Sequence, residues 1–150
     1  MNIRYLPGSM KYMTTTSSGG VVLTPDSIHV AVVGLGYVGL PTALSLHDAG
    51  FHVTGLDINQ ERLDAIRNGR VDSSSVAEEE IASALHGRRL GLTDDASVLA
   101  DADVVLIAVP TPVDESRTPE MNALESACSS YVQAARKGQT VILTSTTYVG

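Results

Sequence analysis

The segment HVAVVGLGYVGLPTALSL, residues 29–46, places three glycines between an apolar run and a stretch with helical spacing. The run at 28–33 is short and rich in β-branched residues, which is typical of a strand buried on both faces. If the helix begins near Tyr37 or Val38, Pro41 lies in its first turn, where proline removes no intrahelical hydrogen bond. The segment therefore predicts a strand, a tight turn and a helix in direct succession.

Strand and helix patterns alternate along the rest of the chain. We expect further strands at 51–57, 89–93, 101–110 and 139–146, and helices at 37–50, 59–69, 74–87 and 122–138. Asn59 opens one of these helices, and a capping box of Ser75 and Glu78 marks the start of another. Because the connections are short, this order predicts an α/β fold of the Rossmann type, with a doubly wound, mainly parallel sheet and helices on both faces.

The beginning of the chain differs from the rest. Residues 1–27 are rich in Ser, Thr, Gly and Met and show no strand or helix period, which predicts a flexible leader before one domain at 28–150. No apolar run is long enough to span a bilayer, and the leader has no apolar segment like that of a secretory signal. We therefore expect a cytoplasmic protein without membrane association.

Charge and metal-binding residue types argue against two further classes of site. The net charge of −7 argues against a nucleic-acid surface, which needs clustered Lys and Arg. Neither the four histidines nor the single cysteine, Cys128, has the spacing of metal ligands. We expect no metal site, and a packing role for Cys128 within the helix at 122–138.

The three glycines stand in the context that a dinucleotide-binding motif requires, directly after a strand and at the start of a helix. Gly34 would allow the tight turn, Gly36 the close approach of a pyrophosphate, and Gly39 the close packing of helix on strand. Backbone N–H groups at such a helix start, here at Tyr37 and Val38, can hold phosphate without a basic side chain.

An acidic residue supports this interpretation. Asp57 ends the second strand, 23 residues after Gly34. A carboxylate about 20 residues after the first glycine accepts the ribose hydroxyls, and it favours NAD over NADP, whose 2′-phosphate it repels. Arg62 would either meet a 2′-phosphate or take an exposed helix position against the adenine. The alternative to dinucleotide binding is a structural turn, with Asp57 acting as a helix cap.

Two loops after later strands are further candidates. The segments at 108–119 (AVPTPVDESRTP) and 145–150 (STTYVG) both leave strands at the carboxyl edge, where open α/β sheets bind ligands. Each has a structural alternative, a rigid loop in the first case and an ordinary turn in the second. The residues that would lie beside the cofactor are Val109, Pro110, Thr111, Ser145 and Thr146.

Three segments together resemble the amino-terminal domain of the UDP-glucose/GDP-mannose dehydrogenases. They are VAVVGLGYVGLPTALSLHDAGFHVTGLDIN, VVLIAVPTPVDESRTPEM and KGQTVILTSTTYVG, and the resemblance covers residues 28–150. The VPTP and STTYVG motifs are most similar to the UDP-N-acetylhexosamine 6-dehydrogenase branch, with UDP-glucose 6-dehydrogenase as the next choice. Thr144 departs from that pattern, because an acidic or basic residue is common there in some relatives.

The resemblance implies NAD as cofactor and a UDP-sugar as substrate. Such enzymes oxidise the C6 alcohol of the sugar to a carboxylate in two hydride transfers, with two NAD+ and a cysteine thiohemiacetal. By position, the glycines and Asp57 would bind NAD, and Thr146 would match a threonine that helps to position water or the reacting centre. The family's catalytic Cys, Lys and Asn lie further along its sequence, so we expect these 150 residues to be inactive alone.

Two alternatives belong to other classes. One is a different Rossmann oxidoreductase, such as a β-hydroxyacid dehydrogenase, and the other is a non-enzymatic module that binds NAD. For the dehydrogenase we expect a homo-oligomer at full length. For this chain we expect weak, concentration-dependent association through uncovered sheet edges and helix faces.

Overall fold

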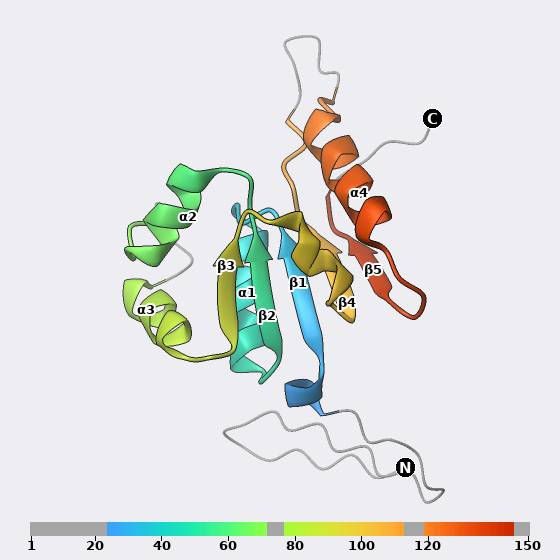
Figure 1. Ribbon diagram of the computed structural model, residues 1–150. Coiled ribbons are helices and arrows are strands. Elements are labelled where there is room, and N and C mark those ends of the chain that lie inside the picture. The colour runs from blue at the N-terminus through green and yellow to red at the C-terminus, as the bar shows by residue number, and fades with distance from the viewer. Residues whose placement is uncertain (1–23, 72–76, 113–118, 146–150) are drawn as a thin grey trace, which may run out of the picture.

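The computed structural model describes residues 24–71, 77–112 and 119–145. Its centre is a sheet of five strands in the order β3-β2-β1-β4-β5, and all four neighbouring pairs are parallel (Figure 1). The strands are β1 (His29–Val33), β2 (His52–Leu56), β3 (Leu90–Thr93), β4 (Val104–Ile107) and β5 (Thr140–Leu143). The predicted Rossmann-type sheet is confirmed.

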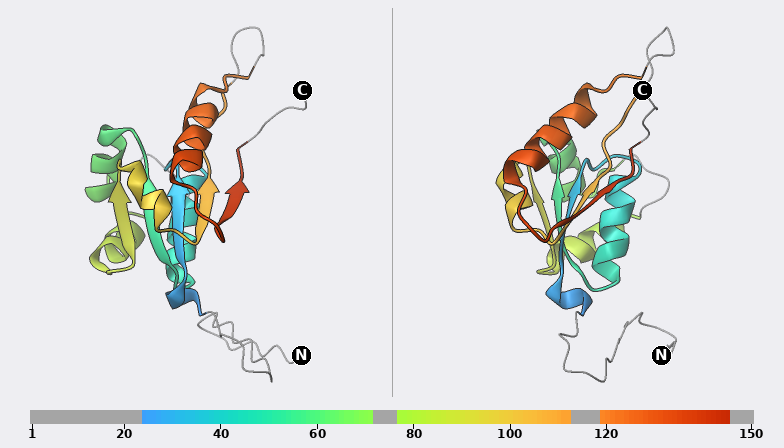
Figure 2. Two further views of the ribbon diagram at one scale, coloured as in Figure 1. Left: turned by 45° about the vertical axis from the view of Figure 1, so that its right-hand side comes forward. Right: turned by 90° about the vertical axis from the view of Figure 1, so that its right-hand side faces the viewer.

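Helices cover both faces of this sheet, as expected. The elements on one face are α1 (Gly39–Asp48), α2 (Gln60–Arg67) and α3 (Glu78–His86), and those on the other are the 3-10 helix η2 (Ala96–Ala100) and α4 (Asn122–Ala134). Figure 2 shows α1 and α4 on opposite sides of the strands. Each face has its own apolar cluster, and alternate residues of β1 supply both: Val32 packs in the first cluster and Ala31 in the second.

Register places the ends of the three central strands at one level. Val33 of β1 is paired with Leu56 of β2 and with Ile107 of β4. The backbone pairing extends one residue further, because Gly34 donates to the Leu56 carbonyl and Ala108 to the Val33 carbonyl, each at 2.8 Å. The loops that follow these strands therefore start side by side at the carboxyl edge of the sheet.

The expected elements are present, but most are shorter than expected. Helix α1 begins at Gly39, which still leaves Pro41 in the first turn. The strand expected at 101–110 is reduced to β4, because Asp101 is the C-cap of η2, a short helix that was not expected from the sequence. The chain before the domain also differs: residues 25–27 form a turn of 3-10 helix, η1.

The predicted start of the helix at 74–87 is wrong. Helix α3 begins at Glu78 after the N-cap residue Ala77, which makes no side-chain cap, so Glu78 cannot close a capping box. Ser75 lies outside the described residues. The first turn instead holds Glu78, Glu79 and Glu80, and negative charges at a helix N-terminus interact favourably with the helix dipole.

The amino edge of the sheet is joined by side chains. Arg136 donates from Nε to the Ala100 carbonyl at 2.7 Å and from Nη2 to the Asp103 carboxylate at 3.1 Å. The same carboxylate accepts from the backbone N–H of His29 at 3.0 Å. Asp103, the residue directly before β4, thus connects this strand with the start of β1 and with the chain after α4.

Strand β5 is the exception to the buried pattern. All four of its residues are exposed, and Val141, Ile142 and Leu143 retain 43–47% of their accessible surface. The strand pairs with β4 on one side only and forms an edge of the sheet. Within the described ranges, no helix is long and apolar enough to cross a membrane.

Candidate functional site

The candidate site lies where the order of the strands changes direction. The chain after β1 leads to β2 on one side, whereas β4 leads to β5 on the other, so the loops after β1 and β4 separate at the carboxyl edge. In open α/β sheets this switch point is where ligands bind. The two loops touch here: a Cβ atom on Gly34 would lie 2.9 Å from the Ala108 carbonyl oxygen and 3.0 Å from Val109 Cγ1.

Two of the three motif glycines are required by the protein itself. Gly34 has φ of +88°, a left-handed conformation that side chains with a Cβ rarely adopt. A Cβ on Gly39 would overlap the Gly34 carbonyl oxygen, so only glycine lets α1 start this close to the end of β1. These contacts give Gly34 and Gly39 the turn and packing roles expected from the sequence.

Gly36 differs, because a Cβ built there would meet no atom of the described residues within 4 Å, apart from its own chain neighbours. The described residues offer no acceptor to the backbone N–H groups of Gly36, Tyr37, Val38 and Gly39. The Tyr37 and Val38 side chains are exposed. Unpartnered N–H groups beside open space at a helix N-terminus form a cradle that fits a phosphate group.

Asp57 faces this loop from the end of β2. Its Oδ2 accepts a hydrogen bond from the backbone N–H of Leu35 at 2.8 Å, and its Oδ1 accepts from the N–H of Asn59 at 2.9 Å. The cap of α2 is Asn59, as predicted, because its Oδ1 accepts from the N–H of Arg62 at 3.0 Å. The helix-cap alternative for Asp57 is therefore not what the structure shows.

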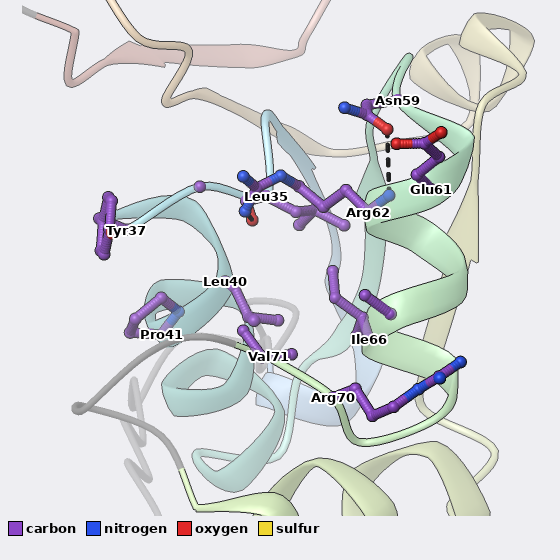
Figure 3. A pocket seen from close by; sticks show the side chains of 12 residues that line it. Leu35, Tyr37, Leu40, Pro41, Asn59, Glu61, Arg62, Ile66, Arg70 and Val71 are labelled. Atoms are coloured by element: carbon purple, nitrogen blue, oxygen red, sulfur yellow. Dashed lines mark hydrogen bonds between the residues drawn. The ribbon is translucent and has the colours of Figure 1, made fainter.

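The contact that Arg62 makes does not follow from the sequence pattern. Its Nη1 donates to the Leu35 carbonyl at 3.2 Å, so the side chain crosses from α2 to the glycine loop (Figure 3). It borders a pocket of about 360 Å³ between α1 and α2. Tyr37 of the glycine loop lines one side of this pocket, and Arg70, just after the end of α2, lines another part of it. Spacing places Arg62 near the loop, but a bond to a backbone carbonyl leaves no signal in the sequence.

The later loops meet at the same edge. Ser145 donates its hydroxyl to the Val109 carbonyl at 2.7 Å, so the exits of β4 and β5 are in contact. Pro110 is exposed and Thr111 is half-buried beside it. Thr146, the predicted catalytic residue, lies outside the described residues.

Cys128 lies on α4, where it is half-buried against the apolar cluster under that helix. Neighbouring residues in the cluster include Tyr131 and Leu124. In the described part of the chain, no three His, Cys, Asp or Glu side chains gather in a way that could hold a metal ion.

A family model and individual relatives both identify this chain as similar to nucleotide-sugar dehydrogenases. The model of the "UDP-glucose/GDP-mannose dehydrogenase family, NAD binding domain" matches residues 28–150. The chain is 39% identical over 125 residues to UDP-N-acetyl-D-mannosamine dehydrogenase of Escherichia coli, and this match covers 81% of this chain and 28% of that enzyme. It is also 39% identical over 123 residues to UDP-N-acetyl-D-glucosamine 6-dehydrogenase of Pseudomonas aeruginosa, with 82% and 28% covered.

A solved structure, UDP-D-ManNAc dehydrogenase from Pyrococcus horikoshii, superimposes with a TM-score of 0.72 at 31% identity. The match covers 79% of this chain and 28% of that one. The chain thus spans less than a third of the length of these relatives. These matches favour the nucleotide-sugar dehydrogenases over the β-hydroxyacid dehydrogenase alternative.

Proposed function

Because the chain belongs to the UDP-glucose/GDP-mannose dehydrogenase family and forms its NAD-binding domain, we propose that it serves the oxidation of a UDP-sugar C6 alcohol to a carboxylate with two NAD+. The names of its relatives favour a UDP-N-acetylhexosamine as substrate. NAD supplies the hydride acceptor of such a reaction. The part of this chain is to bind and orient that acceptor.

The cradle after β1 carries the proposal. The N–H groups of residues 36–39 would hold the pyrophosphate, helped by the positive end of the dipole of α1. The open space at Gly36 supports this assignment, since an added side chain would fill the place of the ligand and not of protein. The residues assigned to the pyrophosphate are Gly34, Gly36, Tyr37, Val38 and Gly39.

Asp57 is assigned to the adenosine ribose. An ionised carboxylate offers about four lone-pair sites. The backbone N–H groups of Leu35 and Asn59 use two of them. The remaining lone pairs can accept from ribose hydroxyls, whereas the 2′-phosphate of NADP would meet a negative charge. Arg62, which stands beside the same loop, is assigned to the adenosine end.

The exits of β4 and β5 are assigned to the rest of the cofactor. Val109 and Ser145 are joined by a hydrogen bond, and Pro110 and Thr111 continue along the same edge. Thr146, the residue after Ser145, is assigned a role in positioning water or the reacting centre. We expect no sugar oxidation by these 150 residues alone, because Cys128, their one cysteine, lies within helix α4 and packs against its apolar cluster. Cytoplasmic location and a homo-oligomeric full-length enzyme complete the proposal.

The experiment is a fluorescence titration of the chain with NADH and with NADPH. Protein emission interferes little, because the sequence has no Trp. We expect NADH to bind at least about tenfold more tightly than NADPH, a difference of about 1.4 kcal/mol. Asp57→Ala should narrow that ratio. Asp101→Ala is the matched control, since it removes an equal charge at an exposed position near the opposite edge of the sheet.

Failure of a folded wild-type chain to bind either nucleotide would contradict the proposal. An unchanged NADH to NADPH ratio in Asp57→Ala would contradict the assignment of the carboxylate to the ribose. A non-enzymatic module would bind NADH in the same way, but it would gain no dehydrogenase activity when the remaining part of such an enzyme is supplied.

A further inference from the structure

Leu35, the residue between the first two motif glycines, is held at three points. Its N–H donates to Asp57 Oδ2 at 2.8 Å, and its carbonyl accepts from Arg62 Nη1 at 3.2 Å. Its side chain is fully buried in the cluster under α1 and α2. Backbone donor, backbone acceptor and side chain of one loop residue are therefore all fixed by neighbouring elements.

The space for the Leu35 side chain is left by Gly55 in β2, which has no side chain of its own. A Cβ atom on Gly55 would lie 2.9 and 3.0 Å from the two Cδ atoms of Leu35, so the leucine occupies the space that a larger residue would fill. Residues two apart in a strand lie on the same face, so Gly55 and Asp57 both face the glycine loop. The sequence GLD at the end of β2 thus provides both this space and a carboxylate.

We propose that Leu35 is a positioning residue, through which β2 and α2 set the shape of the pyrophosphate-binding loop before the cofactor arrives. This inference rests on the proposed function. Loops with glycine on both sides of one residue have large conformational freedom, and a ligand that has to order them loses affinity. Anchoring Leu35 removes that cost, because Gly34 and Gly36 flank a fixed point.

One consequence concerns the two charged residues. Asp57 and Arg62, assigned to the adenosine end, also hold the loop that binds the pyrophosphate. Asp57→Ala should therefore weaken NADH binding for two reasons: the ribose contact is lost, and the Leu35 N–H loses its acceptor. The NADH to NADPH ratio reports the ribose contact, whereas a loss shared by both nucleotides reports the loop.

Gly55→Ala tests the anchor without altering any group assigned to the cofactor. The added methyl displaces Leu35, and we expect the dissociation constants of NADH and NADPH to rise together, by about tenfold or more, with their ratio unchanged. Gly91→Ala is the control, because it is the same change in the neighbouring strand β3, where the nearest atom outside its own chain neighbours is Thr54 Oγ1 at 4.0 Å. It should leave both constants as in the wild type.

A second pair of variants separates positioning from stability. Leu92 also contacts the Gly55 position, at 3.0 Å, but it belongs to β3 and not to the loop. Leu35→Ala should weaken both nucleotides, whereas Leu92→Ala should lower the thermal midpoint alone. In the double variant Leu35→Ala with Gly55→Ala, the smaller residue makes room for the methyl, so the two losses of affinity should be less than multiplicative.

Wild-type nucleotide affinity in folded Gly55→Ala overturns the inference. If that variant does not fold, Leu35→Ala decides: a lower thermal midpoint with unchanged affinity overturns the inference, and weaker binding of both nucleotides supports it. A folded wild-type chain that binds neither nucleotide would contradict NAD binding itself. That result would overturn the proposed function together with this inference.

Discussion

Strands β1 and β5 have similar apolar sequences but very different surroundings. In β1, the four residues from Val30 to Val33 are buried, whereas in β5 every residue from Thr140 to Leu143 is exposed. Strand β1 is paired on both edges and covered on both faces, while β5 is paired on one edge. Apolar composition thus specifies a strand, but the neighbours decide how much of it is buried.

The position of the candidate site follows this difference. The glycine loop, Asp57 and Arg62 all attach to β1, β2 and the helices over them, where the packing is complete on both sides. From the β5 side, the described residues contribute the contact of Ser145 with Val109. The loop that we propose to hold the pyrophosphate is thus attached to the part of the sheet that is paired on both edges and packed on both faces.

The same substitution in the two strands should give the largest contrast. Val32→Thr replaces a fully buried methyl with a hydroxyl that finds no partner in the apolar cluster, which should lower the free energy of unfolding by about 1–3 kcal/mol. Val141→Thr, at a half-exposed position, should change it by less than about 0.5 kcal/mol. Urea denaturation of both variants measures the difference, and equal losses would show that β5 is covered in solution.

A smaller effect should come from the contact that joins β1 to β4. The His29 backbone N–H, and then Arg136, hold the pKa of Asp103 below its usual value of 3.8. A carboxyl group with a lowered folded-state pKa stabilises the protein above its unfolded pKa, and this contribution is lost as the pH falls through the folded value. Asp103 therefore adds stability at neutral pH and loses it in acid.

Asp103→Asn measures this contribution. At pH 7 it should cost about 1 kcal/mol, at the low end for a charged hydrogen bond because the side chain is half-exposed. The difference from the wild type should shrink as the pH falls from about 5 through 3.8 and below. Unfolding midpoints over that range test the prediction, and a difference that stays constant in acid would assign the loss to packing instead.

The weakest expected effect is self-association through β5. An exposed apolar edge strand presents unpaired backbone groups to a second chain, and a lysine on the edge opposes such pairing. Ile142→Lys should reduce the concentration-dependent association of this chain, measured by sedimentation. Val132→Lys is the control, since Val132 is 72% exposed but belongs to α4 and not to the edge strand. Equal reduction by both variants would indicate association through general apolar contact rather than through the edge.

Sequence reasoning succeeded where the signal is local. Glycine spacing identified the turn after β1, and Asn59 was correctly placed at the start of α2. It failed at the start of α3, where Ser75 and Glu78 form a capping pattern but the helix begins at Glu78. Short apolar stretches such as that of η2 do not show a helical period over so few residues, so this element was missed.

The contacts of the site were harder to predict than its members. Asp57 was singled out by its distance from Gly34, but its bond to the Leu35 N–H depends on how two strands meet. Arg62 and Ser145 are similar cases, because both donate to backbone carbonyls, which every residue carries. Partners of that kind leave no trace in residue type, so their identification needs the three-dimensional arrangement.

The open space at Gly36 implies that the motif glycines would be kept for two different reasons, folding at Gly34 and Gly39 and ligand binding at Gly36. Gly34 and Gly39 meet protein atoms, so any lineage that keeps the fold must keep them, whatever the domain binds. A Cβ on Gly36 would meet no described residue beyond its chain neighbours, so folding alone would allow other residues at this position. If Gly36 is retained in related sequences, ligand binding rather than folding would be the reason, whereas the two neighbouring glycines are required by the fold itself.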